Sequence, residues 1–239
     1  MLYIYHKVYN KMITDVCIIG ERVSGTCFLS KLVTSNTTLK LNNSFGHKHF
    51  FQDIEKIKKS NTAHILFLFI TRDIIEWLQS FMSSTYHASD NLRSCQDFSK
   101  FIRTEWSCVY DETSGIRSSN SLYKKEMMHE RDPETRKRFS NAIKMRTSKI
   151  NENMKIKNFV ENFVHIKYED VRDDPQIFLE SMCSMFCIPR YVDFVPIDTV
   201  KGRGSTKYVR KIYPAIEHDD LLYIMEEMDE DVEKKIGYI

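Results

Sequence analysis

Short apolar runs are separated by segments of helical periodicity along much of the chain. Residues 16–19 form a β-branched apolar run that ends at Gly20, and residues 64–71 are almost entirely apolar. Residues 163–168 form a third run of similar length. Runs of this length and composition predict strands of a parallel sheet that is covered on both faces.

Each apolar run is followed by a predicted helix. Apolar residues recur at helical spacing from about Thr26 to Thr34, and again over residues 74–82. After the third run, Asp174 and Pro175 are typical of a helix start. The order predicts an α/β fold, with a P-loop-like central parallel sheet flanked by helices.

The segment from about 84 to 162 interrupts this alternation. It is polar and is predicted to be a helical insert, with an apolar stripe followed by a charge-rich stretch over residues 124–157. The stripe consists of Phe98, Phe101, Ile102 and Val109. Near the end of the chain, apolar residues over 221–232 predict one terminal helix with a solvated acidic face. With 239 residues, the chain is predicted to be a single domain, 1–239.

Composition narrows the function classes. The formal net charge of +2 lacks the basic excess of a dedicated nucleic-acid binder. The longest apolar run, residues 65–70, is too short to span a bilayer, and the first twelve residues interleave polar with apolar positions, unlike a secretory signal. We therefore expect a soluble cytoplasmic protein that binds neither nucleic acid nor membrane.

The cysteines are dispersed and contain no C-x-x-C pair. Their pattern is typical of reduced cytosolic thiols. Cys183 and Cys187 are four residues apart, as two metal ligands on one helical face would be, but no second ligand pair accompanies them. We expect them to be packing residues, and no metal is predicted. The six cysteines are Cys17, Cys27, Cys95, Cys108, Cys183 and Cys187.

The turn between the first strand and the first helix has the composition of a phosphate-binding loop. Its sequence, GERVSGT from Gly20 to Thr26, contains two glycines, two hydroxyls and an arginine. Glycines let backbone N–H groups approach a phosphate, and the helix N-terminus adds a positive dipole end. A nucleotide kinase would have lysine at Thr26. Taken by itself, the segment favours an ordinary glycine-bearing βα turn.

A second basic position follows the second strand. Arg72 closes that strand, and Ser80 lies about two helical turns later, so both could face one phosphate. Taken singly, Arg72 favours a surface ion pair and Ser80 a solvated helix face.

Four motifs resemble the nucleotide-binding motifs of sulfotransferases that use 3′-phosphoadenosine 5′-phosphosulfate (PAPS), and they follow one another in the same order and at similar separations. They are GERVSGT, ITRDIIEWLQSF, IKYEDVRDDP and KGRG, and the first resembles the GERNSGT signature of one subgroup. The resemblance covers the nucleotide-binding framework from Val16 to about Arg203, and the insert matches only loosely. It implies PAPS as cofactor and sulfuryl transfer to an acceptor hydroxyl or amine, with the insert over the acceptor side.

The resemblance also implies a set of cofactor-binding residues. Phe28 would lie near adenine, Tyr168 would contact the adenine edge, and Arg72 with Ser80 would hold the 3′-phosphate. The late loop that closes over this phosphate would be Lys201, Gly202 and Arg203. The residues implied around the 5′-phosphosulfate are Arg22, Ser24, Gly25, Thr26 and Cys27.

One position departs from the family pattern. Many members have a lysine in the first loop where this chain has Val23, so another cation must stabilise the leaving group. Arg22 and Lys48 are the candidates. Lys48 belongs to a segment, residues 45–51, at the place where the family has its base, and we predict His49 as the general base with His47 as the alternative. The two histidines could instead be partly exposed structural residues.

The acceptor is the least defined part of the prediction. It is expected to be a small molecule or a carbohydrate. Residues of the insert could line its cleft or could equally be core aromatics and surface charges; they are Trp106, Tyr110, Arg131, Asp132 and Arg146. Two other functions stay open, a nucleotide-kinase-type phosphotransferase and a binding protein for PAPS or its product that has lost catalysis.

Overall fold

A computed structural model describes residues 3–6, 12–200 and 205–239 of the chain. Contacts divide the chain into two compact units. The first, here called the sheet unit, comprises Met1–Asp73 and Glu152–Ile212. The second unit comprises Ile74–Asn151 and Tyr213–Ile239. The predicted insert lies mostly in the second unit, which also contains the C-terminal segment.

The described part of the sheet unit contains a five-stranded sheet in the order β1-β5-β4-β2-β3. Four of these strands are parallel, and β1 pairs antiparallel with β5 at one edge. The parallel α/β sheet predicted from the apolar runs is thus confirmed, whereas β1 was not expected. The strands are β1 (Tyr3–His6), β2 (Asp15–Gly20), β3 (Lys40–Leu41), β4 (Ile65–Thr71) and β5 (Asn162–Lys167).

The register of the parallel strands brings their carboxyl ends to one edge. Gly20 of β2 lies opposite Ile70 of β4, and Thr71 lies opposite Lys167 of β5. All seven residues of β4 are buried, as a central strand covered on both faces requires. The loops that follow β2, β4 and β5 therefore begin close together, where ligands bind in open α/β sheets.

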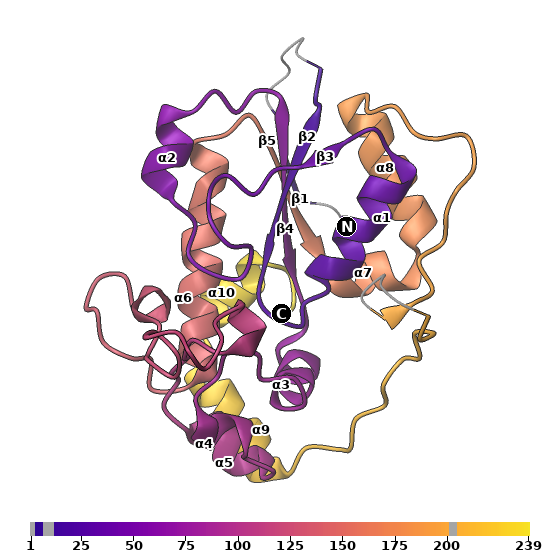
Figure 1. Ribbon diagram of the computed structural model, residues 1–239. Helices are drawn as coiled ribbons and strands as arrows, with labels where there is room; N and C mark the ends of the chain where they lie inside the picture. The colour runs from indigo at the N-terminus through magenta and orange to yellow at the C-terminus, as the bar shows by residue number, and fades with distance from the viewer. Residues whose placement is uncertain (1–2, 7–11, 201–204) are drawn as a thin grey trace. The chain divides into compact units, whose positions relative to one another are not determined.

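Helices flank the sheet of this unit. Figure 1 shows α1 (Thr26–Asn36) and α8 (Pro175–Phe186) to the right of the sheet and α2 (Ile54–Lys59) to its left. The short helix α7 (Tyr168–Asp173) follows β5 directly. Asp174 accepts a hydrogen bond from the Ile177 N–H (3.1 Å) and caps α8, as the Asp-Pro sequence predicted.

The core of the sheet unit lies between the sheet and the helices α1 and α8. It is formed by aliphatic residues of three strands packed against the inward faces of both helices. Its buried members include Val16, Ile18, Leu29, Leu32, Val33, Leu66, Leu68, Ile70, Val164, Ile166, Phe178, Leu179 and Met182. The loops at the carboxyl edge are thus built on a rigid, well-packed base.

The second unit is less helical than the sequence predicted. Residues 104–141, all of them described, contain two short 3₁₀ helices and otherwise irregular chain. Val109, expected on a helical stripe, pairs instead with Glu126 in an isolated bridge. The helices of this unit are α3 (Ile74–Met82), α4 (Asp90–Arg93), α5 (Phe98–Arg103), α6 (Ala142–Lys155, whose last turn belongs to the sheet unit), α9 (His218–Glu227) and α10 (Glu230–Lys235).

Two residues considered for the acceptor cleft are buried in the core of the second unit. Trp106 is 1% exposed and donates a hydrogen bond from Nε1 to Glu130 (3.3 Å). Arg146 is 2% exposed and forms an ion pair with Glu233. Glu130 also pairs with Lys149 in the interior. The core-aromatic alternative therefore holds for Trp106, and Arg146 is a buried charge.

The predicted single terminal helix is two helices. The break falls at Met228, and Asp229 caps α10 by accepting a hydrogen bond from the Val232 N–H (3.1 Å). Glu226 and Glu230 are exposed, in agreement with a solvated acidic face. Within the described residues, no helix is both long and apolar enough to cross a membrane.

Candidate functional site

The loop between β2 and α1 is packed so tightly that its two glycines have no room for a side chain. Gly25, the N-cap of α1, has a left-handed φ of 93°. A Cβ atom there would lie 2.7 Å from Cε2 of Tyr168, and one on Gly20 would lie 2.5 Å from the carbonyl oxygen of Ile70. Since real Cβ atoms do not approach that closely, both positions require glycine.

The loop is held by its own hydrogen bonds. The backbone N–H and the hydroxyl of Ser24 both donate to the carbonyl oxygen of Glu21, at 3.2 and 2.6 Å. Ser24 is fully buried and Thr26 is 3% exposed. The Ser24 hydroxyl, predicted to contact a phosphate, thus shapes the loop in this structure. The N-cap of α1 is a glycine and has no side chain to accept the first N–H groups of the helix, which suits an anion site.

Residues 48 and 49 bind both backbone groups of Gly20. The Gly20 N–H donates to the carbonyl oxygen of Lys48 (3.0 Å), and Nδ1 of His49 lies 2.8 Å from the carbonyl oxygen of Gly20. Because a carbonyl only accepts, Nδ1 carries the hydrogen and Nε2 is the basic nitrogen of the ring. The segment predicted to supply the base therefore lies against the glycine loop.

The two cations proposed to replace the loop lysine occupy different surroundings. Lys48 reaches the first turn of α1, where its Nζ donates to Sγ of Cys27 (3.1 Å). Arg22 is 1% exposed, and its guanidinium lies over the Phe50 ring at 5.1 Å. The structure thus places the Lys48 ammonium at the N-terminus of α1.

His49 is kept neutral by its surroundings. Burial lowers its pKa well below the ordinary value of 6.5, the positive charge of Arg22 lowers it further, and the hydrogen bond to Gly20 opposes both effects. The neutral ring with its proton on Nδ1 is the form that can accept a proton at neutral pH. His47 is exposed and contacts the His49 ring, with 5.3 Å between centroids.

The depressed pKa of His49 should make stability fall in mild acid. Below pH ~6.5 the unfolded chain takes up the proton that folded His49 excludes, so folding loses up to about 1.4 kcal/mol per pH unit until the lower folded pKa is reached. Urea unfolding at pH 7 and pH 5.5 should show a smaller loss for His49→Gln than for the wild type. Equal losses in the two proteins would contradict a depressed pKa at this position.

Arg72 and Tyr168 meet at the same loop from the ends of two other strands. Nη1 of Arg72 donates to the carbonyl oxygen of Val23 (3.2 Å), and its guanidinium lies over the Tyr168 ring at 4.8 Å. Tyr168 is the first residue of α7, and its ring fills the space beside Gly25. Burial, with a contact to Tyr208, raises the pKa of Tyr168, so its hydroxyl stays protonated.

No protein-family model matches this chain, and no curated protein matches it. The resemblance to sulfotransferases therefore rests on the four motifs. Three of them, GERVSGT, ITRDIIEWLQSF and IKYEDVRDDP, contribute residues to the cluster around Gly25, namely the loop itself, Arg72 and Tyr168. The fourth motif, with Lys201, Gly202 and Arg203, lies outside the described residues.

The other predicted binding residues are more dispersed. Phe28 is half-buried and packs against the core of the sheet unit. Ser80 lies in α3, in the second unit, and its carbonyl oxygen accepts a hydrogen bond from the Ser83 hydroxyl (2.8 Å). A joint role of Ser80 with Arg72 stays a prediction.

Three residues in contact with the site were not predicted. Phe50 lies under Arg22, Glu169 accepts a hydrogen bond from the Asp73 N–H (3.1 Å), and the hydroxyl of Tyr208 lies 3.1 Å from that of Tyr168. Glu169 follows Tyr168 within the YED motif, which is a sequence signal that could have identified it. Tyr208 has no such signal, because its contact depends on a long connection returning to α7.

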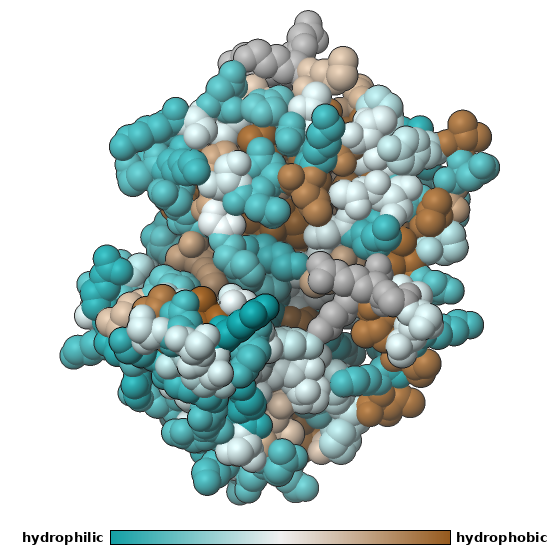
Figure 2. Space-filling model, in the orientation of Figure 1, coloured by the Kyte–Doolittle hydropathy of each residue, from teal (hydrophilic) through white to brown (hydrophobic). Residues whose placement is uncertain are grey.

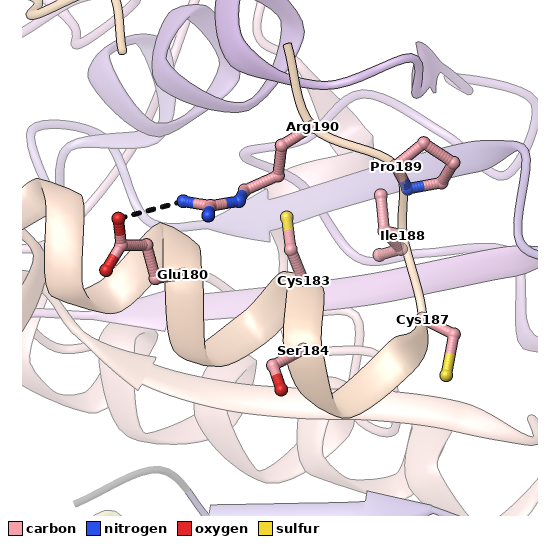
Figure 3. Close-up of a pocket in the computed structure, with 7 residues that line it drawn as sticks. All are labelled: Glu180, Cys183, Ser184, Cys187, Ile188, Pro189 and Arg190. Atoms are coloured by element: carbon pink, nitrogen blue, oxygen red, sulfur yellow. Dashed lines mark hydrogen bonds and ion pairs between the residues drawn. The ribbon is translucent and has the colours of Figure 1, made fainter. Parts of the chain in front are cut away.

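A separate pocket lies at the C-terminal end of α8 (Figure 3). It has a volume of about 320 Å³ and is lined by none of the predicted binding residues. Cys183 is buried in the core, and burial raises its pKa to about 11, whereas Cys187 is exposed and its sulfur points away from Cys183. The packing interpretation thus holds for Cys183 and is wrong for Cys187. In the described ranges, no three His, Cys, Asp or Glu residues are grouped to hold a metal ion.

Proposed function

We propose that this chain binds PAPS at the loop of residues 20–25 and transfers its sulfuryl group to an acceptor hydroxyl or amine. The observation that carries the proposal is the convergence of three segments on that loop. Lys48 donates to Cys27 in the first turn of α1, and His49 binds the carbonyl group of Gly20. Arg72 donates to Val23, and the Tyr168 ring lies against Gly25. A tight glycine cradle at a helix N-terminus, flanked by two cations, fits a ligand with phosphates at two positions.

The residues of the cradle divide the chemical tasks between them. PAPS supplies an activated sulfuryl group, whose bond to the bridging oxygen breaks as the acceptor attacks sulfur. Nε2 of His49 takes the acceptor's proton, because Nδ1 is held by the Gly20 carbonyl. Lys48, beside the first turn of α1, neutralises charge on the bridging oxygen and takes the role of the lysine that Val23 replaces. Arg72 binds the 3′-phosphate.

The site also suits the acceptor classes expected from the sequence. A neutral imidazole can accept the proton that a phenol, a sugar hydroxyl or a neutral amine loses as it attacks sulfur, so small molecules and carbohydrates are the first acceptors to test. Catalysis here consists of positioning two reactants and stabilising developing charge, and the proposal needs no covalent enzyme intermediate.

Calorimetric titration with adenosine 3′,5′-bisphosphate, the product of PAPS, tests the proposal directly. The wild type should bind it more tightly than ATP with magnesium in the same buffer. Arg72→Ala should weaken binding about 10- to 100-fold, since a charged hydrogen-bond donor to phosphate is lost. Arg117→Ala is the matched control, because Arg117 is exposed and lies in the second unit.

The same titration distinguishes the alternatives. A preference for ATP with magnesium would overturn the sulfotransferase proposal in favour of a phosphotransferase. Selective bisphosphate binding without any turnover of PAPS, in the presence of a panel of phenols, sugars and amines, would instead favour a non-catalytic binding protein.

A further inference from the structure

A long exposed segment, here called the strap, follows α8 in the sheet unit. Its described residues are 189–200 and 205–212, and all of them except Val200 lie outside any helix. Figure 2 shows apolar groups along the right-hand edge of the molecule, over the segment coloured orange in Figure 1. The strap's most exposed apolar residues are Tyr191, Val192, Val195, Val209 and Ile212. Within the strap, Phe194 and Ile197 pack against the core of the sheet unit, and polar contacts attach the segment at two further places.

The first attachment of the strap is Asn36, the last residue of α1. Its side chain donates to the carbonyl oxygen of Val195 (3.0 Å) and accepts from the Val195 N–H (2.7 Å). The Asn36 carbonyl oxygen also accepts from the Tyr191 N–H (3.0 Å). Since Asn36 is 2% exposed, this end of the strap is fixed to the C-terminus of α1 by shielded hydrogen bonds.

The second attachment is at α7, near the opposite end of α1. The hydroxyls of Tyr208 and Tyr168 lie 3.1 Å apart. Two residues further on, Arg210 contributes, after Arg172, to lowering the pKa of Asp173 in α7. Tyr208 and Arg210 thus both act on residues of α7.

Tyr208 is itself held by pairing within the strap. Its backbone N–H donates to the carbonyl oxygen of Asp198 (2.6 Å), and the Val200 N–H donates to the carbonyl oxygen of Thr206 (2.8 Å). The Tyr208 side chain is 41% exposed, so its contact with Tyr168 is made at the surface. The paired residues therefore direct the Tyr208 hydroxyl toward Tyr168.

We propose that Tyr208 is a positioning residue for the nucleotide site, and that it acts through Tyr168. The Tyr168 ring fills the space beside Gly25 and lies against the Arg72 guanidinium at 4.8 Å. A contact that holds the Tyr168 hydroxyl therefore also holds the ring in position between the glycine loop and Arg72. This inference rests on the proposed function. If attachment of the strap to α7 strengthens ligand binding, ligand binding must strengthen that attachment by the same factor, because linkage between two sites is reciprocal.

Tyr208→Phe tests the inference by removing one hydroxyl. Calorimetry should show adenosine 3′,5′-bisphosphate binding about 2- to 10-fold more weakly, as expected for one lost hydrogen bond. Tyr168→Phe combined with Tyr208→Phe should lose no more affinity than Tyr168→Phe alone, because the two residues act as one unit. Tyr191→Phe is the matched control, since Tyr191 is 53% exposed on the same strap, and its affinity should equal that of the wild type.

Limited trypsin digestion supplies a second measurement. Lys207, Arg210 and Lys211 are exposed in the strap, and the bisphosphate should slow cleavage after them in the wild type and less so in Tyr208→Phe. A wild type that does not bind the bisphosphate contradicts the proposed function and this inference with it. Bisphosphate binding and protection that are unchanged in Tyr208→Phe contradict the inference alone, as would faster cleavage in the variant with unaltered affinity.

Discussion

His49→Ala is expected to slow sulfuryl transfer about 10²- to 10⁴-fold, the usual contribution of a general base. The Nδ1 hydrogen bond to Gly20 leaves Nε2 as the proton acceptor, and the depressed pKa keeps it unprotonated at neutral pH. The rate is measured as release of adenosine 3′,5′-bisphosphate from PAPS with an active acceptor. Affinity for the bisphosphate should change far less than the rate, because the imidazole acts on the acceptor.

The pH dependence of the rate sharpens this test. Wild-type activity should stay level as the pH falls from 7.5 through 6.5 and should decline only at lower pH, where His49 becomes protonated. His64→Ala is a suitable control, since His64 is a partly buried residue in the turn that precedes β4. If His49→Ala transfers sulfuryl groups as fast as the wild type while His47→Ala does not, the base is His47.

Gly25→Ala is expected to be the most destabilising single-methyl substitution in the glycine loop. Alanine at a φ of 93° is strained, and its Cβ would overlap the Tyr168 ring. Together these effects should lower the free energy of unfolding by about 2–5 kcal/mol. Bisphosphate binding should weaken as well, because the Tyr168 ring that the new Cβ displaces also lies against the Arg72 guanidinium.

Gly115→Ala separates backbone strain from the clash. Gly115 also has a positive φ, of 76°, but a Cβ there would meet nothing within 4 Å. Its substitution should therefore cost only the strain, about 1–2 kcal/mol. Urea unfolding measures the loss of unfolding free energy in both variants. Equal losses would contradict a close contact between Gly25 and Tyr168.

The part of the site built by consecutive residues could be predicted from the sequence. The run from Val16 to Gly20 followed by the GERVSGT turn specified strand, loop and helix, because β-branched residues, glycines and a helical period each indicate one local structure. Arg72 was placed correctly at the end of β4 for the same reason. Parallel strands then bring their carboxyl ends together without further information from the sequence.

Contacts between distant segments were beyond prediction. The pairing of β1 with β5 depends on a partner more than a hundred residues away, and nothing local in the first residues indicates it. The contact of Tyr208 with Tyr168 is of the same kind. Residues 104–141 were predicted to be helical as part of a polar insert with an apolar stripe that ends at Val109. Their structure instead depends on buried partners such as Glu130 and Lys149.

Gly20 connects the proposed base to the sheet. Its N–H and carbonyl group are both bonded by the Lys48–His49 segment, while its backbone is paired in register with Ile70 of β4. The imidazole is therefore held in place by a residue of a central strand, although His49 itself belongs to an irregular segment. If a bound ligand rearranges the rest of the loop, His49 should keep its position, because its anchor belongs to the sheet. The sheet, and not the loop, then determines where the proposed proton acceptor lies.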